Sequence, residues 1–329
     1  MKTFTQKRSA SEMTSLHQHT KAPPADNEQQ PKVPYALDAK RRKKGKDLIP
    51  ENYPEVPKLD KFDVKKNTLP DHFLMLLEGA RRGGKSEFLR FLLYFYKDKF
   101  AEVIVMTKTP HNGFWQPIVG NQWVHDGWDP FLMQKIMQDQ AELARQEYER
   151  DPTASQKEIV SRIKHPLVIL DDIIGDRSKT AGGVSIHNDE ILDAVATRGR
   201  HFGISCVITT QDPVGVGTPL RNNADVVVIF QQKTKRAKKY MTEDFLAFKL
   251  DFSWQTNDLL KTYTMNHDAI FMFMANLEKG TKNTYFHVPQ SYTWDKKKDK
   301  SLVPDYQMGC EEQQRLARTN AGRIPLFPA

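Results

Sequence analysis

Residues 73–86 have the sequence FLMLLEGARRGGKS. The apolar run at 73–77 is typical of a buried strand. Gly79 to Ser86 match the pattern G-x-x-x-x-G-K-[ST] at every fixed position,. Glycines let backbone N–H groups close around phosphate oxygens, and the N-terminus of the following helix adds partial positive charge. The sequence therefore predicts a phosphate-binding loop between a strand and a helix.

The side chains of this loop predict the ligands as well. Lys85 is expected to reach the β- and γ-phosphates of a nucleotide, and the Ser86 hydroxyl is expected to bind Mg²⁺. ATP and Mg²⁺ are therefore the predicted cofactors. The pattern assigns no role to the two arginines. The predicted nucleotide-binding residues are Gly79, Ala80, Arg81, Arg82, Gly83, Gly84, Lys85 and Ser86.

The rest of the chain predicts the sheet around this loop. Apolar runs of strand length recur at 103–106, 167–170, 204–209 and 226–230, and segments with helical spacing separate them,. Fully apolar strands that alternate with helices are typical of a mainly parallel α/β sheet with helices on both faces. Two later runs, near 270–274 and 285–288, are expected to be edge strands.

An acidic pair follows the apolar run at 167–170. Asp171 and Asp172 would lie at the carboxyl end of that strand, where ligands of open α/β sheets bind,. Asp171 is expected to hold Mg²⁺ together with Ser86, and Asp172 is expected to polarise the attacking water as a general base. Without the phosphate loop, the same pair would fit a capped turn equally well.

Two further features complete the predicted catalytic set. Gln211 ends the strand at 204–209 and can hydrogen-bond both the γ-phosphate and the attacking water. Arg198 or Arg200 is expected to reach the phosphate of a neighbouring subunit as an arginine finger, with Arg221 as a third candidate. A finger supplied by a neighbour requires a closed ring of identical subunits. Gln211 could instead be a simple polar end of its strand. The arginines could instead be cations favoured at a helix C-terminus.

Composition excludes several classes of protein. The 329 residues contain two cysteines, which excludes a disulfide scaffold or cysteine zinc cluster and suggests a reducing compartment,. No apolar run approaches the length of a membrane span, and the first residues lack the apolar core of a secretory signal. We expect a disordered basic tail at 1–55, a P-loop ATPase domain at 56–290 and a C-terminal extension at 291–329.

The net charge of +8 is concentrated in the tails. Residues 1–50 carry 11 Lys/Arg against 5 Asp/Glu, and residues 291–329 carry 7 against 5, so the body is neutral. The basic run at 40–46 fits a solvated tail, a nuclear address or a phosphate-binding arm. A second run could follow a DNA backbone or form a solvated helix face; its residues are Lys233, Lys235, Arg236, Lys238 and Lys239.

An insertion between the second and third strands contains three tryptophans, Trp115, Trp123 and Trp128. Stacking on nucleic-acid bases is one interpretation. Packing of the inserted element is the favoured one.

Together these motifs resemble the FtsK/HerA superfamily of DNA-pumping ATPases, and most of all the genome-packaging ATPases of poxviruses, other large or midsize eukaryotic DNA viruses and their virophage-like relatives. The resemblance covers about residues 70–275. Its discriminating part is the stretch Gly199–Ser205, which leads into the strand that ends at Gln211. The departure is Asp172, where bacterial members have glutamate.

The resemblance implies a RecA-like (ASCE) core that acts as a ring, with ATP between subunits and double-stranded DNA in the pore. It implies that Lys85 and Ser86 bind ATP and Mg²⁺, that Asp171 and Asp172 serve metal and water, and that Gln211 senses the γ-phosphate. A capsid or portal-vertex protein is the implied docking partner. The implied location is the cytoplasm or nucleus of a host cell at sites of virion assembly, or the virion.

Three functions follow from these observations. The leading hypothesis is an ATP-driven DNA translocase that packages a viral genome into preformed capsids. A helicase or a conjugation-type coupling ATPase is a second, although the chain shows neither a second motor domain nor membrane helices. A non-motor nucleotide switch or virion interaction protein is a third, and the intact Asp171, Asp172 and Gln211 argue against it.

Overall fold

A computed structural model gives the fold of most of the chain. It describes residues 56–174, 189–247, 253–274, 284–287, 294–295, 300–301 and 305–320. The predicted basic tail at 1–55, and much of the predicted extension at 291–329, lie outside the described residues.

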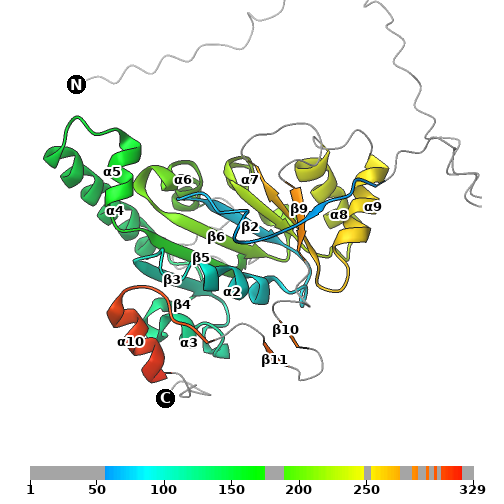
Figure 1. The fold of residues 1–329 in the computed structure, drawn as a ribbon, viewed down its shortest axis with the longest axis horizontal. Helices are drawn as coiled ribbons and strands as arrows, with labels where there is room; N and C mark the ends of the chain where they lie inside the picture. The colour runs from blue at the N-terminus through cyan, green and yellow to red at the C-terminus, as the bar shows by residue number, and fades with distance from the viewer. Residues whose placement is uncertain are drawn as a thin grey trace, which may run out of the picture. The chain divides into compact units, whose positions relative to one another are not determined.

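The core is a nine-stranded sheet with the order β1-β9-β8-β7-β2-β6-β5-β3-β4 (Figure 1). β2 lies in the middle of this order and carries the phosphate loop at its carboxyl end, between β7 and β6. The strands are β1 Asp60–Lys61, β2 Leu74–Glu78, β3 Glu102–Thr107, β4 Val124–Asp126, β5 Pro166–Ile174, β6 Ser205–Thr210, β7 Val226–Ile229, β8 Ala269–Phe273 and β9 Thr284–His287. A separate two-stranded sheet joins β10 Trp294–Asp295 to β11 Lys300–Ser301.

The sheet is mainly parallel, as predicted. β2, β3, β4, β5, β6 and β7 pair in parallel, and only the pairs of β8 with β7 and β9 are antiparallel. The expected edge position of the last two strands is wrong. β8 lies between β7 and β9, and β9 is itself covered because residues 60–61 form β1 in parallel with it. A two-residue strand is too short to give a hydrophobic pattern in the sequence.

Helices cover both faces of this sheet. On one face Leu74 and Leu76 of β2 join a core with α4, α6, α7, α8 and α9, and on the other Met75 and Leu77 pack with α2 and α3. This alternation follows from the two-residue period of a strand. No described helix is both long and apolar enough to cross a membrane. The helices are α2 Lys85–Phe95, α3 Gln116–Val119, α4 Pro130–Arg150, α5 Gln156–Arg162, α6 Glu190–Arg198, α7 Thr218–Asn223, α8 Lys235–Met241, α9 Ser253–Tyr263 and α10 Glu311–Asn320.

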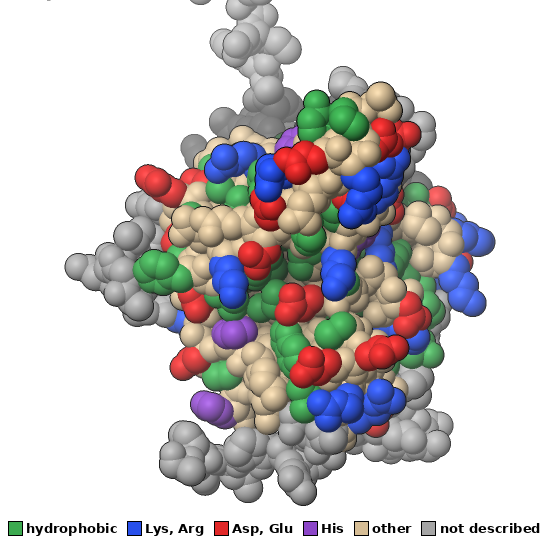
Figure 2. Space-filling view, turned by 90° about the vertical axis from the view of Figure 1, so that its left-hand side faces the viewer, with side chains coloured by type: hydrophobic (Ala, Val, Ile, Leu, Met, Phe, Trp, Pro, Cys, Tyr) green, Lys and Arg blue, Asp and Glu red, His purple; other side chains and the backbone are tan. Residues whose placement is uncertain are grey.

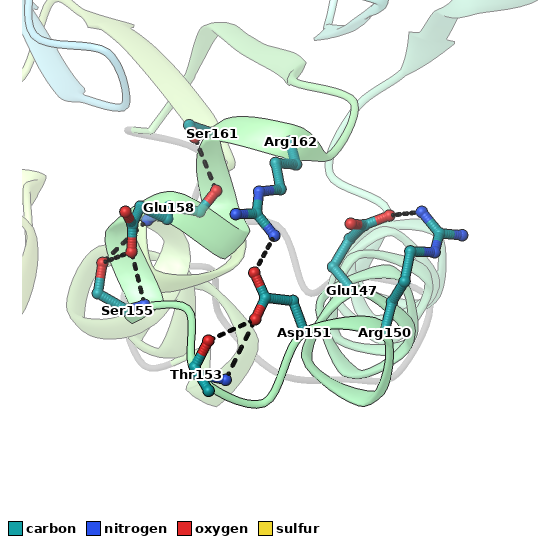
Figure 3. Close-up of polar contacts among 8 residues, drawn as sticks. All are labelled: Glu147, Arg150, Asp151, Thr153, Ser155, Glu158, Ser161 and Arg162. Atoms are coloured by element: carbon teal, nitrogen blue, oxygen red, sulfur yellow. Dashed lines mark hydrogen bonds and ion pairs between the residues drawn. The ribbon is translucent and has the colours of Figure 1, made fainter.

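Local hydrogen bonds fix the turn between α4 and α5 (Figure 3). Ser155 and Glu158 form a capping box at the start of α5, each binding the other's backbone N–H,. The Arg162 guanidinium donates to Asp151 Oδ2 over 3.0 Å, which ties the end of α5 to the end of α4. Acidic and basic side chains are interspersed over this side of the molecule rather than gathered by sign (Figure 2).

The described C-terminal segment, residues 305–320, packs on the α2–α3 face of the sheet. α10, red in Figure 1, lies against the cyan-green α3. The Met308 N–H donates to the Ile118 carbonyl over 2.9 Å, and the Tyr306 hydroxyl donates to the Arg90 carbonyl of α2 over 2.7 Å. This segment is thus part of the packed body.

Candidate active site

The phosphate loop leaves the sheet at the carboxyl end of β2 and enters α2 at Lys85. Gly79 approaches Phe230, the residue after β7, so closely that a Cβ on it would lie 2.5 Å from the Phe230 Cβ. Gly84, immediately before α2, has a φ of 98°, a conformation that residues with a Cβ rarely adopt,. The backbone path therefore requires glycine at these two positions of the motif.

The loop is anchored to the strands on both sides of β2. The Gly79 N–H donates to the Thr210 carbonyl over 3.1 Å, and the Ala80 N–H donates to the Gln231 carbonyl over 3.0 Å. The N–H groups in the first turn of α2 have no intrahelical acceptor, and such a helix N-terminus binds anions readily. The exposed side chains of the loop are Arg81 and Arg82.

Lys85 is buried inside the loop. Its ammonium donates to the Gly79 carbonyl over 2.7 Å and to the Ala80 carbonyl over 3.3 Å. Burial lowers the pKa of Lys85, while the nearby carboxylates of Asp172 and Asp171 act in the opposite direction. The structure therefore brings the predicted phosphate-binding lysine and the predicted acidic pair into one electrostatic neighbourhood.

Asp171 is buried at the centre of a small hydrogen-bond network. The Thr209 hydroxyl donates to Oδ1 over 2.7 Å, and the Trp115 indole N–H donates to Oδ2 over 2.8 Å. Each oxygen thus accepts one hydrogen bond and retains lone-pair capacity. Carboxylate and hydroxyl oxygens are the ligands that Mg²⁺ prefers, usually with retained water and substrate phosphates. Asp171 and Ser86 therefore fit such a cation. Among the described residues, no cluster of three or more His, Cys, Asp or Glu side chains could hold a metal.

Asp172 lies where β5 departs from regular pairing. The register with β6 shifts between Asp171 and Ile174, and Asp172 has a φ of 58°. β5 thus continues past the acidic pair to Ile174, with a bulge-like irregularity at Asp172,. The Gln211 side-chain amide donates to Asp172 Oδ2. Burial is the main cause that raises the pKa of Asp172, so the carboxyl is suited to accept a proton.

The two arginines predicted as fingers lie at the amino ends of the strands, opposite the phosphate loop. Arg198 ends α6, and Arg200 follows in a 3₁₀ turn that precedes the amino end of β6. Because β6 and β2 are parallel, the loop at the carboxyl end of β2 is about 20 Å away, the length of a six-residue strand,. Neither arginine can reach the phosphate loop of its own subunit.

The surroundings of the candidate arginines differ. Arg200 pairs with Asp225 over 3.9 Å and is more than half exposed. Arg198 is exposed, and its side chain makes no ion pair or hydrogen bond within the described residues. Arg221 is held in its own subunit by Asp244 at 3.0 Å and lies over the Tyr240 ring. Its guanidinium is already engaged.

The second basic run begins just before α8. All five predicted DNA-contacting side chains are exposed, and one of them, Lys239, pairs with Glu243 over 3.6 Å. A cavity of about 740 Å³ separates the start of α8 from the loop that follows β6, and Arg236 and Gln211 are among its lining residues. The run therefore borders the candidate site, although its contacts with DNA stay a prediction.

Three functional candidates were missed in the sequence. Thr209 and Trp115 hold Asp171, and Glu78 occupies the last position of β2. Trp115 is fully buried, as expected of a packing role, but its indole N–H serves the acidic pair. The one available signal was Glu78, a charged residue at the end of an apolar strand directly before the phosphate loop.

Glu78 is a buried carboxyl beneath the loop. Its side chain is 0% exposed, and neither oxygen has a hydrogen-bond partner within the described residues. Burial raises the pKa of Glu78 to about 8; Lys85 and Arg221 oppose the shift and Asp212 adds to it. The folded protein therefore holds this side chain as a neutral acid near pH 7.

We expect Glu78→Gln to stabilise the protein progressively between pH 5 and pH 8. In this range the folded state binds a proton that the unfolded state, with a pKa near 4.5, has lost. Wild-type stability should therefore fall by about 1.4 kcal/mol per pH unit from this group and level off above the folded pKa. Urea unfolding of both proteins at four pH values measures the difference. A difference independent of pH would contradict the neutral state of Glu78.

Comparisons with known proteins give distant relatives. No family model matches the chain. An uncharacterized protein of Acanthamoeba polyphaga mimivirus is 23% identical over 189 residues, which span 57% of this chain and 61% of that protein. The chain thus matches less than two thirds of that relative's length.

Solved structures similar to this chain include the following three. The genome packaging NTPase of Sulfolobus turreted icosahedral virus 2 with AMPPCP has a TM-score of 0.43 and 15% identity, over 67% of this chain and all of that one. The pCW3 conjugation coupling protein TcpA has a TM-score of 0.47 and 15% identity, over 70% and 69%. The cytoplasmic domain of the Thermomonospora curvata type VII secretion ATPase EccC has 0.42 and 12%, over 78% and 29%.

The fold class rests on the chain's own geometry. The phosphate loop joins a central strand to a helix, and β6 lies between that strand and the strand that carries the acidic pair. With its mainly parallel sheet and helices on both faces, this chain has the fold of a P-loop NTPase.

Proposed function

We propose that this chain is a Mg²⁺-dependent ATPase that drives double-stranded DNA, and that its task is to package a viral genome into preformed capsids. One observation carries the ATPase part. Three neighbouring strands bring their functional side chains together at their carboxyl ends. These side chains are the buried ammonium of Lys85, the acidic pair and Gln211. A glycine-rich turn without catalytic purpose would not need these partners.

The loop would bind the triphosphate. Backbone N–H groups at the start of α2 would face the phosphate oxygens, and the Lys85 ammonium would exchange its carbonyl acceptors for the β- and γ-phosphates,. Ser86 and Asp171 would hold the cation, and bound Mg²⁺ would neutralise part of the phosphate charge. The two hydrogen bonds that Asp171 accepts fix its carboxylate in place.

Asp172 and Gln211 would act on water. The Gln211 amide, already bonded to the Asp172 carboxylate, would orient the water between them and the γ-phosphate. As the water oxygen attacks phosphorus, Asp172 would accept its proton and ADP would leave with the β–γ bridging oxygen. The raised pKa of Asp172 supports this base role, because a more basic carboxylate accepts a proton more readily,.

The DNA part of the proposal rests on charge and on the resemblance. The body of the chain is neutral overall, so a positive surface must come from local clustering, which the run beginning at Lys233 provides beside the candidate site. The relative from mimivirus agrees with a viral origin of the function. Packaging, the ring and the capsid partner follow from the resemblance and are the finer part of the proposal.

Steady-state ATP hydrolysis with and without long double-stranded DNA, at low and moderate salt, tests the function. Stimulation by duplex that weakens with salt is expected of a DNA motor. Tight nucleotide binding with slow turnover that ignores DNA would instead favour a nucleotide switch. Stimulation by single strands with duplex unwinding would favour a helicase.

Neutralising the basic run should weaken the response to DNA without touching hydrolysis itself. We expect Lys235→Gln with Lys238→Gln to keep the DNA-free rate, because both side chains are exposed. Each lost phosphate contact should reduce the slope of log affinity against log salt by about 0.9. Duplex binding by anisotropy over a salt series measures it. The matched control is Lys135→Gln with Lys157→Gln, on α4 and α5; an equal loss there would contradict a DNA role of this run.

A further inference from the structure

The hydrogen bond between Trp115 and Asp171 joins two residues 56 positions apart. Trp115 is the largest fully buried side chain of the described residues. Its indole N–H donates to the carboxylate and not to a backbone carbonyl. The Thr209 hydroxyl binds the other oxygen, so each Asp171 carboxylate oxygen accepts a hydrogen bond. These two bonds fix the orientation of the carboxylate plane.

An indole is well suited to this task. Its N–H is a donor only, so it cannot compete for a cation, and it does not titrate. A hydrogen bond to an ionised carboxylate is roughly twice as strong as a neutral one. Groups that orient a metal ligand in this way change metal affinity by about 10- to 100-fold when they are removed.

Trp115 is itself held by its neighbours. Its carbonyl accepts from the N–H groups of Ile118 and Val119 over 2.9 and 3.0 Å, which fixes it to α3. The Phe114 ring meets the Trp115 ring edge-on, with centroids 5.0 Å apart. The position of the indole thus depends on the position of α3.

The C-terminal segment holds α3 against the sheet. The side-chain amide of the fully buried Gln313 donates to the Val103 carbonyl over 2.6 Å, and its oxygen accepts from the Val103 N–H over 3.2 Å. α10 packs on α3, and a Cβ on Gly120 would lie only 3.4 Å from the Ala317 nitrogen. A segment some two hundred residues away along the chain therefore braces α3 and β3 together.

We infer that Trp115 is a positioning residue that orients Asp171 toward its cation, and that residues 305–320 keep Trp115 in that position by bracing α3. The inference rests on the proposed function, since it concerns the cation that accompanies ATP. It assigns the C-terminal segment an indirect part in the chemistry of the candidate site, through α3 and Trp115.

The test measures cation binding directly, without turnover. Mn²⁺, which replaces Mg²⁺ and is visible by electron paramagnetic resonance, is titrated into full-length protein saturated with a non-hydrolysable ATP analogue. Trp115→Phe keeps an aromatic ring but loses the donor, and we expect it to bind Mn²⁺ about tenfold more weakly or worse. Affinity for a fluorescent ATP analogue, measured in EDTA, should be unchanged, because Trp115 lies outside the phosphate loop.

Trp123→Phe is the matched control. Trp123 belongs to the same insertion, but its indole donates to Glu102 over 2.9 Å rather than to the acidic pair, so Mn²⁺ affinity should stay at the wild-type value. Gln313→Leu, similar in volume, tests the brace and should weaken Mn²⁺ in the same direction by a smaller factor. Wild-type Mn²⁺ affinity in Trp115→Phe would overturn the positioning role of Trp115. Wild-type Mn²⁺ affinity in Gln313→Leu would overturn the bracing role of the C-terminal segment. Failure of wild-type protein to bind Mn²⁺ with nucleotide would overturn the proposed function as well.

Discussion

Replacement of Lys85 with alanine is expected to lower ATP hydrolysis by roughly 10³-fold or more. The ammonium is the one positive side chain buried within the described part of the loop, and it lies beside Asp171 and Asp172. Without it, the negative charge of the transferred phosphoryl group would lose one of its positive partners beside the acidic pair. Phosphate release at saturating ATP measures the loss, and binding of a fluorescent nucleotide separates it from weakened affinity.

Two companion variants make the Lys85 result specific. Lys85→Arg keeps the charge, but its planar guanidinium does not fit the pocket of a compact ammonium, so activity should remain low. Lys99→Ala removes a lysine that donates to the Pro70 carbonyl, and it should hydrolyse ATP like the wild type. Wild-type hydrolysis by a folded Lys85→Ala protein would show that the phosphate loop is not the catalytic site.

The parts of the fold that could be predicted are those encoded locally. The strands β2, β3, β5, β6 and β7 each contain an apolar run, and the phosphate loop is a fixed pattern of glycines and one lysine within eight positions. Their mainly parallel pairing follows from alternation with helices, whereas their order in the sheet was not predicted. Parallel neighbouring strands have their carboxyl ends on the same side of the sheet. The sequence could therefore place Asp171, Asp172 and Gln211 together there.

The parts that could not be predicted depend on contacts between distant residues. Gln313 is 210 positions from Val103, and no local sequence pattern predicts the hydrogen bonds between them. Trp115 was one of three similar tryptophans, and only the packing of α3 decides which one meets Asp171. β1 consists of Asp60 and Lys61, which have no strand pattern and pair only because β9 offers an open edge. These features follow from tertiary packing.

The Arg200→Ala variant should lose hydrolysis by about 10³-fold while it still binds ATP. Arg200 lies some 20 Å from the phosphate loop of its own subunit,, so its only route to a phosphate is through an interface. Its pair with Asp225 spans 3.9 Å at the surface, and such pairs contribute little to stability, so the folded protein should unfold near the wild-type temperature.

Complementation between two inactive proteins distinguishes a finger in trans from a structural arginine. Lys85→Ala subunits keep Arg200, and Arg200→Ala subunits keep the phosphate loop, so a ring that contains both has complete sites where the loop of one faces the arginine of the other. Activity should therefore reappear on mixing and be highest near equal proportions. Arg198→Ala is the control, because Arg198 lies on the same edge two residues earlier and is exposed. If Arg198→Ala complements and Arg200→Ala remains active, the finger is Arg198. If Arg200→Ala is inactive and no mixture recovers activity, Arg200 is a structural residue and not a finger in trans.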